Sequence, residues 1–134
     1  DNSLDVITLH CSLEHFEDGE DARFLAEGMR LLRPRGRICV IPLYMANHTS
    51  IMTSPSVWSK KYQAYNEAPH FDQRATIYID ESIRQRQHKY YDAKALSEDL
   101  GLIMAQASQV IVFDLEHYAQ INGCPAFALL ITKK

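Results

Sequence analysis

The residues best suited to proton transfer stand together in the sequence Leu13-Glu14-His15-Phe16. An imidazole group has an ordinary pKa of about 6.5, so it can accept a proton near neutral pH. A neighbouring carboxylate can hold such a ring in place or act as the base itself. We therefore take His15 as the candidate catalytic base and Glu14 as its catalytic partner. In the alternative interpretation, both side chains only cap the acidic turn that follows and bond to the backbone.

The segments on either side of this pair predict a βαβ unit over residues 1–44. Apolar runs at 6–9 and 38–41 are bounded by chain-breaking residues, as expected for strands buried on both faces. Between them, apolar residues recur at helical spacing, with acidic residues before them, arginines in the last turn and Pro34 to end the helix. A right-handed crossover makes the two strands parallel. Their carboxyl ends, where open α/β sheets bind ligands, then carry residues 10–15 and 42–44.

The second half of the chain predicts a helix and two further strands. Asp92 is placed to cap a helix whose apolar face includes Leu96 and which ends at Gly101. Residues 109–113 and 126–131 predict strands. Smaller features are also expected: a short helix at 56–65, a strand at 76–79 and a helical turn at 116–121. The long connection 45–91 is an insertion too rich in aromatic residues for a disordered linker.

Three spaced features resemble the second half of class I S-adenosylmethionine-dependent methyltransferases, in particular their small-molecule, type-11-like branch. They are a strand opened by Asp5, the Glu14-His15 pair after it, and Leu31-Leu32-Arg33-Pro34-Arg35-Gly36 before the next strand. The family usually has glycine where this chain has Arg35. The resemblance implies an α/β fold of partial Rossmann-like type. Its mixed sheet would have about four strands, two parallel and then an antiparallel pair, with flanking helices and residues 38–41 beside both the first strand and the last.

The resemblance also implies a site that uses S-adenosylmethionine as the cofactor. By position, His10, Cys11 and Ser12 would approach the cofactor, while Glu14 and His15 would face the methyl acceptor. We expect a small-molecule acceptor, such as the hydroxyl of a glycan or metabolite, bound under the insertion 45–91. Its candidate binding residues are Tyr44, Trp58 and Tyr62, which supply apolar area with a polar group. In the alternative interpretation, these aromatic residues pack the insertion against the sheet.

Composition limits the other functions. The 134 residues suit one soluble domain, and a net charge of −3 with a pI of about 6.1 argues against nucleic-acid and membrane partners. The basic run at 84–89 is expected to be a solvated face. Three cysteines without metal-ligand spacing predict reduced core thiols and a cytoplasmic protein, and no segment suits a membrane span or a signal peptide. The six histidines also lack metal-ligand spacing, so we expect no metal.

None of the five glycines forms a G-x-G motif, which the cofactor half of such a methyltransferase requires. We therefore expect the chain to be the carboxyl half of a longer enzyme, and to be inactive alone. Its first strand would have an open edge that pairs two copies as a homodimer. Two alternatives remain open: a non-catalytic methyltransferase-like interaction module, and another doubly wound nucleotide-binding enzyme.

Overall fold

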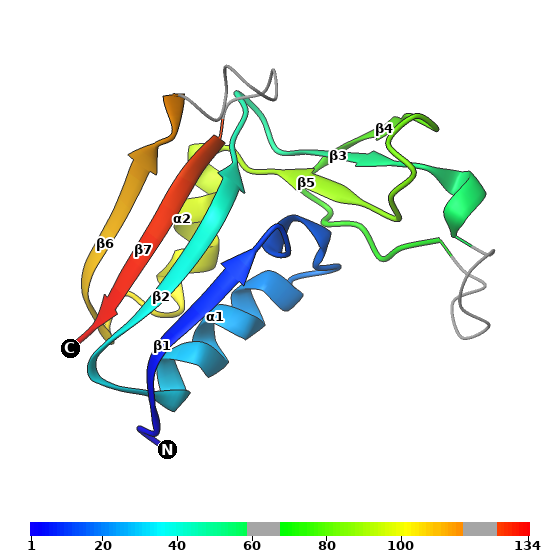
Figure 1. The fold of residues 1–134 in the computed structure, drawn as a ribbon. Coiled ribbons are helices and arrows are strands. Elements are labelled where there is room, and N and C mark those ends of the chain that lie inside the picture. The colour runs from blue at the N-terminus through cyan, green and yellow to red at the C-terminus, as the bar shows by residue number, and fades with distance from the viewer. Residues whose placement is uncertain (59–67, 117–125) are drawn as a thin grey trace.

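A computed structural model describes residues 1–58, 68–116 and 126–134 (Figure 1). The strands are β1 (Leu4–His10), β2 (Leu32–Tyr44), β3 (Ser50–Thr53), β4 (Thr76–Ile79), β5 (His88–Tyr90), β6 (Ala107–Asp114) and β7 (Ala126–Lys133). The helices are α1 (Glu20–Leu31) and α2 (Ala93–Gly101), with short 3-10 helices η1 (Leu13–His15) and η2 (Pro55–Val57). Within these described ranges, no helix is long and apolar enough to cross a membrane.

The main sheet has four strands in the order β1-β2-β7-β6. β1 and β2 are parallel, whereas β7 is antiparallel to both β2 and β6. In the centre of the sheet, Ile38 lies opposite Ile7 on one side and Ile131 on the other. The predicted mixed α/β sheet is therefore confirmed, with β2 between the first strand and the last as the partial Rossmann-like fold requires.

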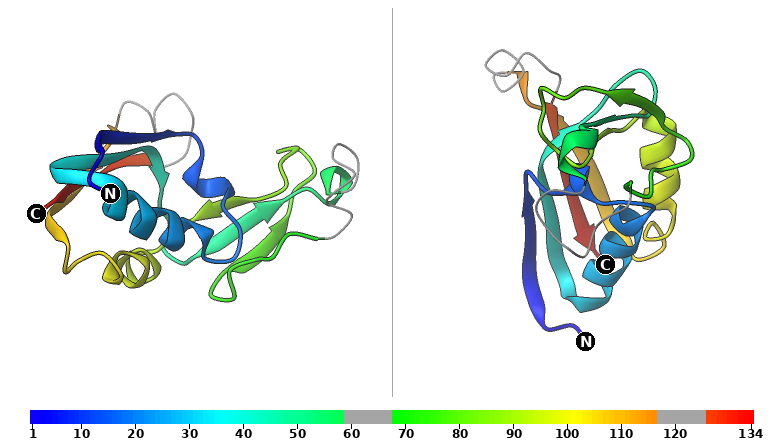
Figure 2. Two further views of the ribbon diagram at one scale, coloured as in Figure 1. Left: turned by 90° about the horizontal axis from the view of Figure 1, so that it is seen from below. Right: turned by 90° about the vertical axis from the view of Figure 1, so that its right-hand side faces the viewer.

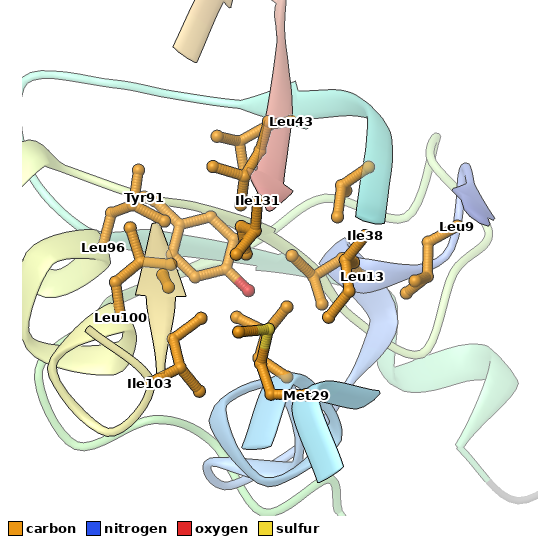
Figure 3. Close-up of a cluster of buried hydrophobic side chains, with 14 of the residues drawn as sticks. Leu9, Leu13, Met29, Ile38, Leu43, Tyr91, Leu96, Leu100, Ile103 and Ile131 are labelled. Carbon is orange, nitrogen blue, oxygen red and sulfur yellow. The ribbon is translucent and has the colours of Figure 1, made fainter. Parts of the chain in front are cut away.

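Both helices cover the same face of this sheet (Figure 2). Leu25 and Met29 of α1 are fully buried, as are Ile38 and Ile131 of the strands. Figure 3 shows Met29, Ile38 and Ile131 facing one interior. The prediction that the first strand is buried on both faces was wrong, because Val6 is 57% exposed. β1 is an end strand, and Val6 lies on the face that neither helix covers.

Near its start, β2 turns at Arg35 and Gly36, where its pairing with β1 shifts register between Leu32 and Arg37. Arg35 has φ of +66°, the left-handed conformation that glycine adopts most easily, at the position where the family usually has glycine. A Cβ on Gly36 would lie 2.9 Å from the Arg33 carbonyl oxygen and 3.1 Å from that of Asp5. Backbone approaches this close explain why glycine stands at 36, whereas the arginine at 35 is accommodated at some conformational cost.

The insertion forms a second sheet, β4-β3-β5, beyond the carboxyl ends of β1 and β2 (Figure 1). It is joined to the main sheet by backbone bonds from Tyr91 N to Tyr44 O (3.0 Å) and from Ala46 N to Tyr91 O (2.9 Å). The strand predicted at 76–79 is confirmed as β4. The prediction of a solvated basic face at 84–89 was wrong for part of the run, because Gln87 and Lys89 are only 2% and 1% exposed.

The start of α2 agrees with the prediction from the sequence. Asp92 caps α2, where its Oδ1 accepts a hydrogen bond from Ala95 N at 2.7 Å. As predicted, the helix ends at Gly101, which is its last helical residue, and the C-cap is Leu102 in a right-handed conformation. Of the short helix predicted at 56–65, the structure describes only the start, as η2. Of the helical turn predicted at 116–121, it describes only the first residue.

Candidate functional site

The loop after β1 forms the rim of the main sheet. Cys11 has φ of +49°, and its N–H still donates to Ile41 O at 3.1 Å, so the turn begins directly at the strand end. Ser12 Oγ donates to His10 O at 2.8 Å, and the His15 N–H donates to Ser12 O at 3.1 Å. His10 and Cys11 are exposed here, which corrects the expectation of a core thiol at Cys11. The three residues predicted to approach a cofactor therefore lie together at this rim.

His15 is held between the insertion and Glu14. Its Nδ1 lies 2.7 Å from the backbone oxygen of Gln87, just before β5. A carbonyl oxygen only accepts, so Nδ1 carries the proton and donates it. The other ring nitrogen, Nε2, lies 3.6 Å from Glu14 Oε1, and the side chains of His15 and Glu14 are 39% and 4% exposed. This arrangement leaves Nε2 as the nitrogen that can accept a proton, with a buried carboxylate beside it to stabilise the resulting cation.

Around His15, the described part of the chain leaves three buried polar atoms without a hydrogen-bond partner: Glu14 Oε2, Gln87 Oε1 and His88 Nε2. The Gln87 side chain is otherwise anchored, because its Nε2 donates to Phe16 O. Unpaired buried polar atoms are rare in native proteins, because each costs about 1–3 kcal/mol. Three of them around one histidine are typical of a functional site.

His88 packs against His15 with ring centroids 5.7 Å apart, and against Tyr44 and Tyr90 at 4.5 and 4.8 Å. Burial, with a smaller contribution from the charge of His15, lowers the pKa of His88 to about 4. His88 is therefore neutral at physiological pH. It forms an uncharged wall beside His15 that does not compete for the same proton.

An open cavity of about 940 Å³ lies beside His15, between α1 and the segment that leads into β5. Its wall includes Phe16 and Phe24, whose rings meet edge to face at 5.5 Å, together with His70 and Arg86. The size is that of a small-molecule site. Because His15 lines the cavity with a partly exposed ring, a ligand there can reach the candidate base.

The residues predicted to bind the acceptor do not gather at this cavity. Tyr44 is 8% exposed and packs on His88 and Tyr90. Trp58 donates from Nε1 to Thr53 Oγ1 at 2.8 Å and contacts the Phe71 ring at 6.1 Å. Neither is among the residues that line the cavity. Tyr62 lies outside the described residues.

A buried ion cluster fixes β5 against α1. Lys89 Nζ lies 2.7 Å from Asp21 Oδ2 and 2.7 Å from Asp72 Oδ2, and the Tyr91 hydroxyl donates to Asp21 Oδ2 at 2.6 Å. Burial opposes ionisation of Asp72, but hydrogen bonds from Arg74 and Lys89 outweigh it and hold the pKa of Asp72 well below its usual value. The cluster therefore fixes the chain two residues after Gln87, whose carbonyl holds His15.

Sequence reasoning missed this part of the site. Gln87, His88 and Lys89 lie more than 70 positions after His15, and no local motif joins them to it or to Asp21. In the structure, Gln87, Lys89 and Tyr91 are buried and alternate with more exposed neighbours, but the sequence of this run does not alternate between polar and apolar residues. Within the described residues, no group of three or more histidines, cysteines, aspartates and glutamates is placed to hold a metal ion.

The comparison with protein families found one match. A family described as a methyltransferase domain matches residues 1–40, which span β1, η1, α1 and the first part of β2. The matched segment contains the rim loop, Glu14 and His15. No curated protein matches the chain.

Proposed function

We propose that this chain takes part in methyl transfer from S-adenosylmethionine to a hydroxyl group of a small molecule. Its first 40 residues match a methyltransferase domain. One observation carries the proposal: the matched segment places His15 in the wall of a cavity, with one ring nitrogen held by a carbonyl and the other beside a carboxylate. A domain of this family thus presents a positioned base where a small acceptor can reach it.

The cofactor would lie at the rim formed by His10, Cys11 and Ser12. This loop follows the carboxyl end of β1, where open α/β sheets bind ligands, and its first two residues are exposed. The fit is partial, because no G-x-G motif occurs in the 134 residues. The proposal therefore requires a glycine-rich segment, not supplied by these residues, to hold the methionine end. When bound, the cofactor supplies an activated methyl group on a positively charged sulfur.

The chain's own residues would align the acceptor and remove its proton. Nε2 of His15 would take the proton of the acceptor hydroxyl, which would become the methylated oxygen. Glu14 stabilises the resulting imidazolium, while Nδ1 keeps its bond to Gln87 O and prevents the ring from turning. Alignment of the reacting groups in a site that excludes water can supply most of the acceleration of such an in-line displacement.

A titration of this chain with S-adenosylmethionine tests the proposal, with backbone amide NMR signals as the readout. We expect weak binding, because the glycine-rich segment is absent, with shift changes centred on Cys11 and Ser12. Adenosine, which lacks the methionine portion, is the matched control, because its weaker binding measures how much the methionine portion contributes to the affinity. Shift changes centred on another edge of the sheet, or none at saturating cofactor, would contradict the proposed site and favour a non-catalytic module.

A further inference from the structure

We propose that the cavity beside His15 binds a planar aromatic acceptor that carries a phenol-type hydroxyl and is neutral or positively charged, and that it excludes anionic analogues. The inference rests on the proposed function for the identity of this ligand as the methyl acceptor. The binding preference itself follows from the cavity wall.

Two phenylalanine rings favour a planar ligand. Phe16 and Phe24 are only partly buried, and their edge-to-face contact at 5.5 Å leaves aromatic surface in the cavity wall. Aromatic rings prefer such offset or edge-to-face partners at centroid distances of about 4.5–7 Å. A flat ring added to this pair continues the same packing, whereas a saturated ring of equal size does not gain the same interaction.

The charges of the wall disfavour anions. Four carboxylates line the cavity, at Glu17, Asp18, Glu20 and Glu27, against two guanidinium groups. Both guanidinium groups already have carboxylate partners: Arg86 Nε lies 2.5 Å from Glu17 Oε1, and Arg23 Nη2 lies 3.1 Å from Glu20 Oε1. Glu27 is likewise paired with Arg30, at 2.7 Å. An anionic ligand would have to displace one of these carboxylates and would still face the carboxylate of Asp18, which has no guanidinium partner among the described residues. A neutral or cationic ligand avoids both costs.

The chemistry of His15 favours a phenolic hydroxyl over an aliphatic one. A phenolic hydroxyl resembles that of tyrosine, with a pKa of about 10, and is far more acidic than water. A neutral imidazole can assist the loss of a proton from the first far more effectively than from a group as weakly acidic as water. Because His15 lines the same cavity as Phe16 and Phe24, a hydroxylated ring bound on the phenylalanine pair shares the cavity with the candidate base.

The test uses phenol, tyramine, 4-hydroxybenzoate and cyclohexanol as probes, added separately to the chain without cofactor. Ring signals of His15 and Phe24 in NMR spectra report binding. We expect phenol and tyramine to bind with Kd on the order of 1 mM, as suits such small ligands. We expect 4-hydroxybenzoate and cyclohexanol to bind at least about fivefold more weakly. Phe24→Leu should weaken phenol binding several-fold. Phe113→Leu, at a phenylalanine that is 46% exposed on β6, is the matched control and should leave phenol binding unchanged.

Three results would overturn the inference. Equal or tighter binding of 4-hydroxybenzoate would refute the charge preference, and equal binding of cyclohexanol, or no response of His15 and Phe24 to any probe, would refute the aromatic site. The measurement is separate from catalysis. If the probes bind as expected and methyl transfer is still unaffected by loss of His15, the proposed function fails and the cavity preference stands.

Discussion

Replacing Lys89 with methionine tests the ion cluster that holds the insertion against α1. Lys89 and Asp21 have side chains only 1% and 2% exposed, and their charged atoms lie 2.7 Å apart. In the variant, Asp72 keeps its bond to Arg74, but Asp21 keeps only neutral donors, the Tyr91 hydroxyl and the Ala22 N–H. Loss of one partner from a buried ion pair leaves an uncompensated charge and costs about 3–5 kcal/mol. That is a large part of the free energy of unfolding of a typical domain, which is about 5–15 kcal/mol.

Urea unfolding followed by circular dichroism measures this loss as a change in the free energy of unfolding. Lys94→Met is the matched control, because its side chain is 85% exposed and 3.9 Å from Glu98, so we expect a change below about 0.5 kcal/mol. Adding Asp21→Asn to Lys89→Met should recover part of the loss, since the orphaned charge is then gone. A loss below about 1 kcal/mol for Lys89→Met, or no recovery in the double variant, would refute the view that Asp21 is desolvated and dependent on Lys89.

Three further predictions concern the turn, the buried histidine and the open strand. Arg35→Gly should raise the free energy of unfolding by roughly 0.5–1 kcal/mol by relieving a positive φ, whereas Gly36→Ala should lower it, both measured by urea unfolding. The pKa of His88 is about 4 in the folded chain and about 6.5 in the unfolded chain, so the unfolded state binds a proton at a higher pH than the folded state. The free energy of unfolding should therefore fall as the pH drops from about 6.5 to 4, by at most about 3 kcal/mol. The variant His88→Gln should flatten this part of the pH profile. We also propose that the exposed edge strand β1 pairs with a second copy about a two-fold axis; light scattering should then show a dimer for the natural chain and a monomer for Val6→Lys, while a monomer in both would contradict it.

The main sheet could be predicted because its signals are local. Periodicity and chain-breaking residues marked β1, α1 and β2, and the capping aspartate marked α2, while the family resemblance supplied the strand order. The burial of β1 could not be predicted in the same way. The apolar run 6–9 is compatible with a strand covered by helices on both faces or on one face only. Val6 is exposed because both helices lie on the other face of the sheet.

The candidate site was predictable only where it is contiguous in sequence. Glu14 and His15 are neighbours, so their chemistry could be recognised directly, but the groups that complete their surroundings come from the insertion. Lys89 illustrates the difficulty. A lysine in a basic run is normally solvated, and its burial depends on carboxylates from α1 and from the loop before β4, which no pattern within the run reveals.

The rate of methyl transfer by the natural protein that contains this chain, measured after loss of His15, tests the central claim most directly. Transfer from labelled S-adenosylmethionine would be measured with the best acceptor in a panel of hydroxyl compounds, for the natural enzyme, His15→Ala and the control His48→Ala, which lies before β3. We expect His15→Ala to lower kcat by on the order of 10²-fold with little change in cofactor affinity, since a general base contributes about that much, and His48→Ala to leave kcat unchanged. An unchanged kcat in His15→Ala, or no transfer to any hydroxyl compound by the natural enzyme, would contradict the account.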